Sequence, residues 1–116
     1  MRVSVVLLSL SLSLAVGCGG SDVTTPPVLP PAANTADVFT PGNVFSPFST
    51  TINVGGTVRF NISGDPHNVI FKRIAGAPSD VNVVNGTIVS RTFSAAGTFS
   101  YDCTVHPGMS GQVVVR

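Results

Sequence analysis

From residue 38 to the end of the chain, short β-prone runs alternate with Gly, Pro and Asn turn signals at intervals of about eight to twelve residues. No window of a dozen residues shows helical periodicity, which argues against a helix bundle or a coiled coil. Within the runs, Phe99 and Tyr101 fall on one face of a strand, with Ser100 and Asp102 on the other. The pattern predicts an all-β sandwich or barrel of about seven or eight short strands. The expected strands cover residues 51–54, 57–62, 67–71, 81–84, 87–89, 92–93, 98–103 and 112–116.

Two glycine-containing turns organise these runs. Gly55-Gly56 separates the strand expected over residues 51–54 from the one over residues 57–62. Asn85-Gly86 is a strong two-residue turn signal, and it predicts that the runs over residues 81–84 and 87–89 pair as a β-hairpin.

The first residues are typical of an export signal. Met1-Arg2 is a short positive region, and residues 3–16 form an apolar stretch shorter than the roughly 17 to 25 residues of a membrane-spanning helix. The segment ends on Cys18 and resembles a bacterial lipoprotein signal, in which the cysteine becomes the lipidated first residue. Ala15-Val16-Gly17 also fits a plain signal-peptidase site, and both interpretations export the chain.

We therefore divide the chain into a signal peptide over residues 1–17, a lipidated Cys18 with a Pro-rich tether over residues 18–37, and a domain over residues 38–116. Pro26-Pro27 and Pro30-Pro31 disfavour helix and central strand in the tether. The expected location is periplasmic or otherwise extracytoplasmic. Gly19, rather than Asp, follows the lipidation site, so the usual sorting rule predicts the outer membrane if the cell has one.

Charge is sparse and balanced. Without residues 1–17 the chain keeps five basic and five acidic side chains, a formal charge of zero, and no basic run exceeds Lys72-Arg73. This argues against binding to a phosphate backbone, so no nucleic-acid partner is expected. It also predicts that docking to a protein partner is mainly apolar and only weakly dependent on salt.

Four side chains with soft or imidazole donors fall in two places: His67 stands alone, and Cys103, His106 and Met109 form a Cys-x-x-His-x-x-Met sequence. A thiolate, two imidazoles and a thioether are the ligand set of a blue-copper site. Zinc would need four strong ligands, and two cysteines in all cannot make a four-thiolate site. Pro107-Gly108 predicts a tight turn that brings three donors together on one loop, with His67 supplied from a separate strand.

The same residues lie within longer motifs. Around the four donors stand Gly55-Gly56, Pro66-His67-Asn68-Val69 and Gly97-x-Phe99-x-Tyr101-x-Cys103-Thr104-Val105-His106-Pro107-Gly108-Met109-x-Gly111. These motifs resemble the plastocyanin/azurin (cupredoxin) family over about residues 38–116, and the short gaps around His106 resemble its amicyanin branch. The resemblance implies a cupredoxin-like Greek-key β-sandwich of about seven to eight short strands.

The resemblance also implies roles for individual residues. His67, Cys103 and His106 would be the equatorial ligands of one type 1 copper ion, and Met109 the axial ligand. Asn68 and Thr104 would support the ligand loops, and His106 with Pro107 would form the electron-transfer patch.

The expected function is electron transfer, in which the copper ion cycles between Cu(I) and Cu(II) as it takes an electron from a donor redox protein and passes it to an acceptor. The carrier is expected to be a monomer, and a lipid on Cys18 is expected to tether it to the membrane. Two alternatives stay open: a copper-binding or trafficking protein without an electron chain, and a structural β-sandwich that makes no use of the four donors. Enzyme activity is not expected, because Cys103 lacks an orienting Asn or Asp at the spacing of thiol enzymes, and the chain has no Cys-x-x-Cys-His haem motif.

Overall fold

In the computed structural model, residues 19–20, 26–29 and 31–116 are described, and their regular secondary structure is entirely β. This confirms the expected all-β class. The signal peptide predicted over residues 1–17 and the lipidation site predicted at Cys18 lie outside the described residues. No helix in the described part of the chain is long and apolar enough to cross a membrane. The strands are β1 (Ala33–Phe39), β2 (Ser49–Ile62), β3 (His67–Phe71), β4 (Val81–Val84), β5 (Thr87–Phe93), β6 (Gly97–Asp102) and β7 (Ser110–Val115).

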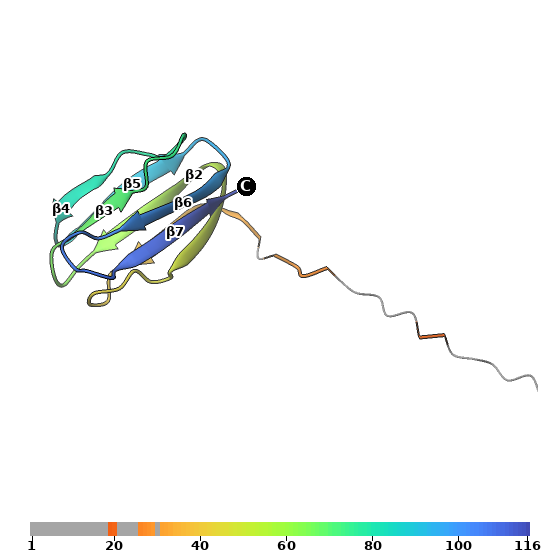
Figure 1. Ribbon diagram of the computed structural model, residues 1–116, viewed down its shortest axis with the longest axis horizontal. Helices are drawn as coiled ribbons and strands as arrows, with labels where there is room; N and C mark the ends of the chain where they lie inside the picture. The colour runs from red at the N-terminus through yellow and green to blue at the C-terminus, as the bar shows by residue number, and fades with distance from the viewer. Residues whose placement is uncertain (1–18, 21–25, 30) are drawn as a thin grey trace, which may run out of the picture.

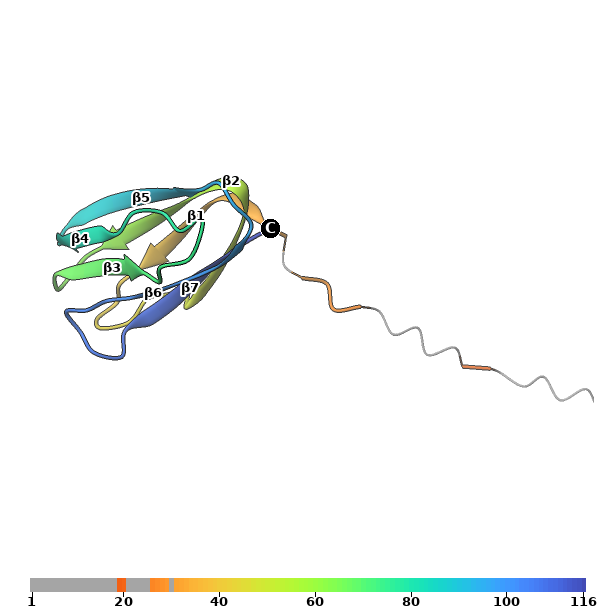
Figure 2. The same ribbon diagram turned by 45° about the horizontal axis from the view of Figure 1, so that its top comes forward.

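The strands form one strongly curled sheet in the order β1-β2-β7-β6-β3-β4, with β5 paired to β2 (Figure 1). The first residues of β2 run parallel to β7, whereas its later residues pair with β1 in parallel and with β5 in antiparallel orientation. Strand β2 therefore belongs to both sides of a sandwich. One side holds β1, β5 and the end of β2, and the other holds β7, β6, β3 and β4. In the turned view of Figure 2, β5 lies along the upper side and β6 and β7 along the lower side.

The change of side occurs at Gly55-Gly56. The sequence predicted a turn between two strands there, but the structure runs one strand, β2, through the pair. Gly55 has a φ of 83°, a conformation that other residues adopt only with strain. A Cβ atom on Gly56 would lie 2.8 Å from the carbonyl oxygen of Asn53. The two glycines thus allow β2 to bend sharply between its two pairing segments.

Aromatic side chains fill the space between the two sides. Tyr101 of β6 stands edge-on to Phe60 of β2, with ring centroids 5.3 Å apart. Phe93 of β5 contacts Phe71 of β3 and Phe99 of β6, although β5 pairs with neither strand. All five rings are at most 2% exposed, which confirms the face that the alternation in the sequence assigned to the core.

The prediction of a hairpin at Asn85-Gly86 was wrong. Strand β4 pairs with β3, and β5 pairs with β2, so the turn carries the chain from one side of the sandwich to the other. Gly86 does adopt the positive φ, 64°, that a turn of this kind requires. The turn conformation was predicted correctly, but the two strands beside it do not pair with each other. Strand β5 pairs with the longer β2, and β4 pairs with the better buried β3.

The start of the β structure also differs from the prediction. Strand β1 begins at Ala33, inside the stretch expected to be tether, and runs parallel to the end of β2. It lies at the edge of the sheet and follows Pro31, so the proline ring interrupts no strand pairing. The pairing places Val38 fully inside the core and carries an ion pair between Asp37 and Arg59.

Candidate metal centre

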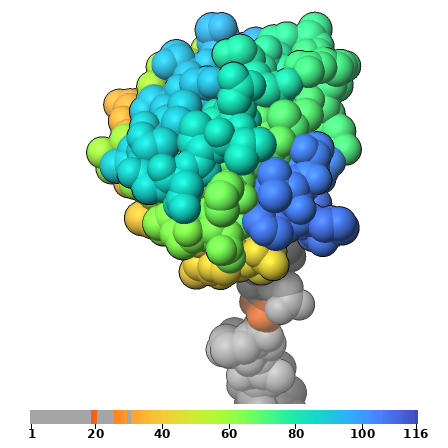
Figure 3. Space-filling model, turned by 90° about the vertical axis from the view of Figure 1, so that its left-hand side faces the viewer, coloured from red at the N-terminus to blue at the C-terminus, as the bar shows by residue number. Residues whose placement is uncertain are grey.

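The four predicted donors come from loops and strand ends at one end of the sandwich. His67 is the first residue of β3, Cys103 directly follows β6, and Met109 directly precedes β7. His106 lies on the connecting loop between Cys103 and Met109. Figure 3 looks onto this end of the molecule, where the green segment leading into β3 lies against the blue loop between β6 and β7.

Three of the donor atoms converge on a common centre. The Nδ1 atoms of His67 and His106 are 3.0 Å apart, and each lies 3.8 Å from Sγ of Cys103. Metal–nitrogen and metal–sulfur bonds are about 2.0 to 2.3 Å long, so two ligands of one ion can be separated by at most about 4 to 4.6 Å. The three atoms satisfy that limit, and a thiolate with two imidazoles suits copper.

Burial prepares His67 to act as a ligand. Its side chain is fully buried, and this burial is the main cause that lowers the pKa of its imidazole. The nearby charge of His106 lowers the pKa further, whereas the charge of Asp65 raises it. The neutral ring keeps a lone pair free for a metal. Its Nε2 is buried without a hydrogen-bond partner among the described residues. His106 is partly exposed, so one ligand ring reaches the surface.

The backbone closes the loop that carries the other donors. The Cys103 N–H donates to the Met109 carbonyl at 2.8 Å, and the Met109 N–H donates to the His106 carbonyl at 3.2 Å. Gly108, with a φ of 83°, supplies the turn between them. These two hydrogen bonds fix the backbone of Met109 to both of the other donor residues on the loop. The Met109 residue is 2% exposed.

Asn68 and Thr104 connect the two ligand-bearing segments. The side-chain Nδ2 of Asn68 donates to Oγ1 of Thr104 at 2.8 Å. The side-chain Oδ1 of Asn68 accepts a hydrogen bond from the Thr104 backbone N–H, also at 2.8 Å. Asn68 is itself buried and Thr104 is exposed, so the two bonds lie at the boundary of the buried site. These bonds join the residue after His67 to the residue after Cys103, which is the contact that the family resemblance implies.

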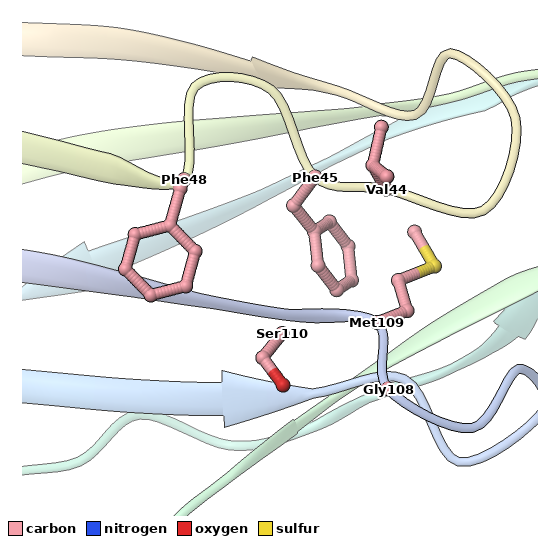
Figure 4. Close-up of a pocket in the computed structure, with 6 residues that line it drawn as sticks. All are labelled: Val44, Phe45, Phe48, Gly108, Met109 and Ser110. Carbon is pink, nitrogen blue, oxygen red and sulfur yellow. The ribbon is translucent and has the colours of Figure 1, made fainter.

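An apolar hollow adjoins the Met109 side of the centre. It has a volume of about 270 Å³ and is lined by Val44, Phe45, Phe48, Gly108, Met109 and Ser110. Figure 4 shows the Met109 side chain pointing toward Val44 and Phe45, which lie on the loop between β1 and β2. Val44 and Phe48 are 52% and 58% exposed. Sequence reasoning did not assign these two residues to the site, because a large apolar residue in a loop gives no signal of where the fold will place it.

Comparison with known proteins agrees with this geometry. The model of the copper binding proteins of the plastocyanin/azurin family matches residues 35–116. Amicyanin-alpha of Methylorubrum extorquens is 41% identical over 69 residues, a match that covers 56% of this chain and 58% of that protein. The chain thus matches little more than half the length of this relative.

Solved structures give the same result. An oxidised amicyanin variant superposes with a TM-score of 0.63 and 33% identity, over 72% of this chain and 83% of that one. A copper-containing nitrite reductase from Thermus scotoductus has a TM-score of 0.63 and 28% identity, but the match covers only 22% of that chain.

Proposed function

The chain belongs to the plastocyanin/azurin family of copper-binding proteins and has one type 1 copper ion as its cofactor, and from this premise we propose that it is an electron carrier. In this proposal His67, Cys103 and His106 would hold the ion, and Met109 would be the fourth donor. A copper ion held there would supply one-electron chemistry between Cu(I) and Cu(II).

The observation that carries the proposal is the convergence of three donor atoms, two imidazole nitrogens and one thiol sulfur, on one centre. Two imidazole nitrogens and the thiol sulfur lie within 3.8 Å of one another, and the Asn68–Thr104 and Cys103–Met109 hydrogen bonds hold their loops. A ligand frame that cannot relax differently for the two oxidation states loses little energy to rearrangement on each transfer.

His106 supplies the route to a partner in this proposal. It is the ligand whose ring is partly exposed, and Pro107 beside it is exposed. Val105, at 42% exposure, adds apolar surface on the same loop. With a balanced charge, we expect a redox donor and acceptor to dock on the monomer through this apolar surface, with only weak salt dependence. No catalytic reaction is proposed.

Repeated redox cycling tests the carrier role. Purified residues 19–116 loaded with one equivalent of Cu(II) are reduced with ascorbate and reoxidised several times, in the presence of a Cu(I)-specific chelator. A carrier is expected to keep its copper and recover its full visible absorption after each cycle. Transfer of the copper to the chelator at each reduction would instead favour a trafficking protein.

We also propose that the chain is exported and attached to the membrane by a lipid on Cys18. The support is the sequence pattern of residues 1–18 and the Pro-rich stretch before β1. Mass spectrometry of the mature protein provides the test. We expect a lipid-modified N-terminal Cys18 and release of the Cys18→Ser variant from the membrane fraction. An unmodified N-terminus at residue 18 would support simple cleavage.

A further inference from the structure

A hydrogen bond between side chains closes the base of the ligand loop. Asp102 precedes Cys103, Ser110 follows Met109, and the two residues are cross-strand partners at the ends of β6 and β7. The Ser110 hydroxyl donates to Oδ1 of Asp102 at 2.8 Å. The backbone hydrogen bond from the Cys103 N–H to the Met109 carbonyl lies next to this contact, one residue further into the loop on each side. The loop is therefore tied at its base by a backbone bond and by a side-chain bond.

Lys72 occupies the second oxygen of the same carboxylate. Lys72 directly follows β3, and its ammonium group pairs with Oδ2 of Asp102. Its side chain is 61% exposed, compared with 37% for Asp102. Asp102 is thus bound from both neighbouring strands, by a neutral donor on one side and a cation on the other.

The carboxylate of Asp102 is a fixed negative charge on the residue adjoining the thiol ligand. A nearby negative charge stabilises Cu(II), which carries one more positive charge, relative to Cu(I). Lys72 places a positive charge directly on this carboxylate, so the two charges largely cancel at the copper centre.

We propose that Lys72, Asp102 and Ser110 form a clasp that closes the base of the ligand loop, with Lys72 cancelling the charge that Asp102 brings beside Cys103. The clasp acts on the copper site of the proposed electron carrier and therefore rests on that function. Asp102 and Ser110 act as positioning residues through the loop, and none of the three side chains is proposed as a ligand.

Variants that separate hydrogen bonding from charge test the clasp. Ser110→Ala removes the hydrogen bond and keeps every charge. In both Cu(I)-loaded and metal-free residues 19–116, amide hydrogen exchange at Cys103 and Met109 is expected to be about two- to tenfold faster, the range for one net hydrogen bond. Ser110→Thr keeps the hydroxyl and should restore slow exchange. Unchanged exchange in Ser110→Ala would overturn the clasp.

The charge is tested by the reduction potential of the copper-loaded protein. Lys72→Gln leaves Asp102 uncompensated and is expected to raise the preference for Cu(II) about three- to tenfold. For a one-electron couple, each tenfold change in the equilibrium constant corresponds to 59 mV, so this preference lowers the reduction potential by about 30 to 60 mV. Asp102→Asn should raise the potential, and the double variant should return close to the parent.

Arg59→Gln is the matched control, because it also removes a cation from an exposed ion pair, with Asp37, on the other side of the sandwich. A Lys72→Gln shift no larger than that of the control would overturn the charge role. The exchange measurement on metal-free protein needs no copper. If the parent protein binds no copper, the proposed function fails while the hydrogen-bonded clasp can still be measured.

Discussion

Replacing Cys103 with serine is expected to abolish the intense blue absorption of the Cu(II)-loaded protein. The band arises from charge transfer between a cysteine thiolate and copper, and a hydroxyl oxygen cannot supply it. Sγ of Cys103 lies 3.8 Å from both imidazole nitrogens, so it is the thiol that can share an ion with them. Once residues 1–18 are removed, Cys103 is also the only cysteine in the chain.

The measurement is the visible spectrum of residues 19–116 with one equivalent of Cu(II), beside the variant. Met109→Gln is the control, because it changes the proposed thioether donor and leaves the thiolate in place. It should keep the blue band and lower the reduction potential. An unchanged spectrum in Cys103→Ser would refute the assignment of the site.

Replacing Gly111 with alanine is expected to cause the largest loss of stability among the glycine positions. Gly111 lies opposite Tyr101 in the β6–β7 pair, and an added Cβ would stand 2.5 Å from the phenol oxygen and 2.6 Å from Cζ. The ring cannot move away, because it stands edge-on to Phe45 at 4.9 Å and to Phe60 at 5.3 Å.

Overpacking of this kind costs about 1 to 3 kcal/mol, and we expect the upper part of that range. For a domain of this size the midpoint of thermal unfolding should fall by roughly 10 to 20 °C. Thermal unfolding followed by circular dichroism measures it. Gly64→Ala, where an added Cβ meets nothing within 4 Å but φ is 82°, should lose only about 1 to 2 kcal/mol from strain.

Tyr101→Phe in the Gly111→Ala background offers a further check. It removes the atom nearest to the added methyl group, a hydroxyl that is buried without a hydrogen-bond partner in the described part of the chain. Part of the lost stability should return. A Gly111→Ala midpoint equal to that of Gly64→Ala would contradict the close packing of Tyr101 on β7.

Much of the metal centre could be predicted from the sequence, because three of its four donor residues lie close together along the chain. Cys103, His106 and Met109 are three residues apart, with Pro107-Gly108 to turn the loop, so their proximity hardly depends on the rest of the fold. For His67, the sequence predicted only that it comes from a separate strand. It reaches Cys103 across 36 residues because β3 and β6 pair, and no local pattern encodes that pairing.

The sequence by itself determined which side chains face the core and where the chain turns, since alternation along a strand and a positive φ at glycine are local properties. It also determined the donor set for copper. Only the tertiary structure decided that the strands beside Asn85-Gly86 pair with β3 and β2, that β1 joins the sheet, and that Lys72 and Ser110 meet at Asp102. The reason is physical: strand partners are selected by the total surface buried across the sandwich, a quantity that no short segment contains.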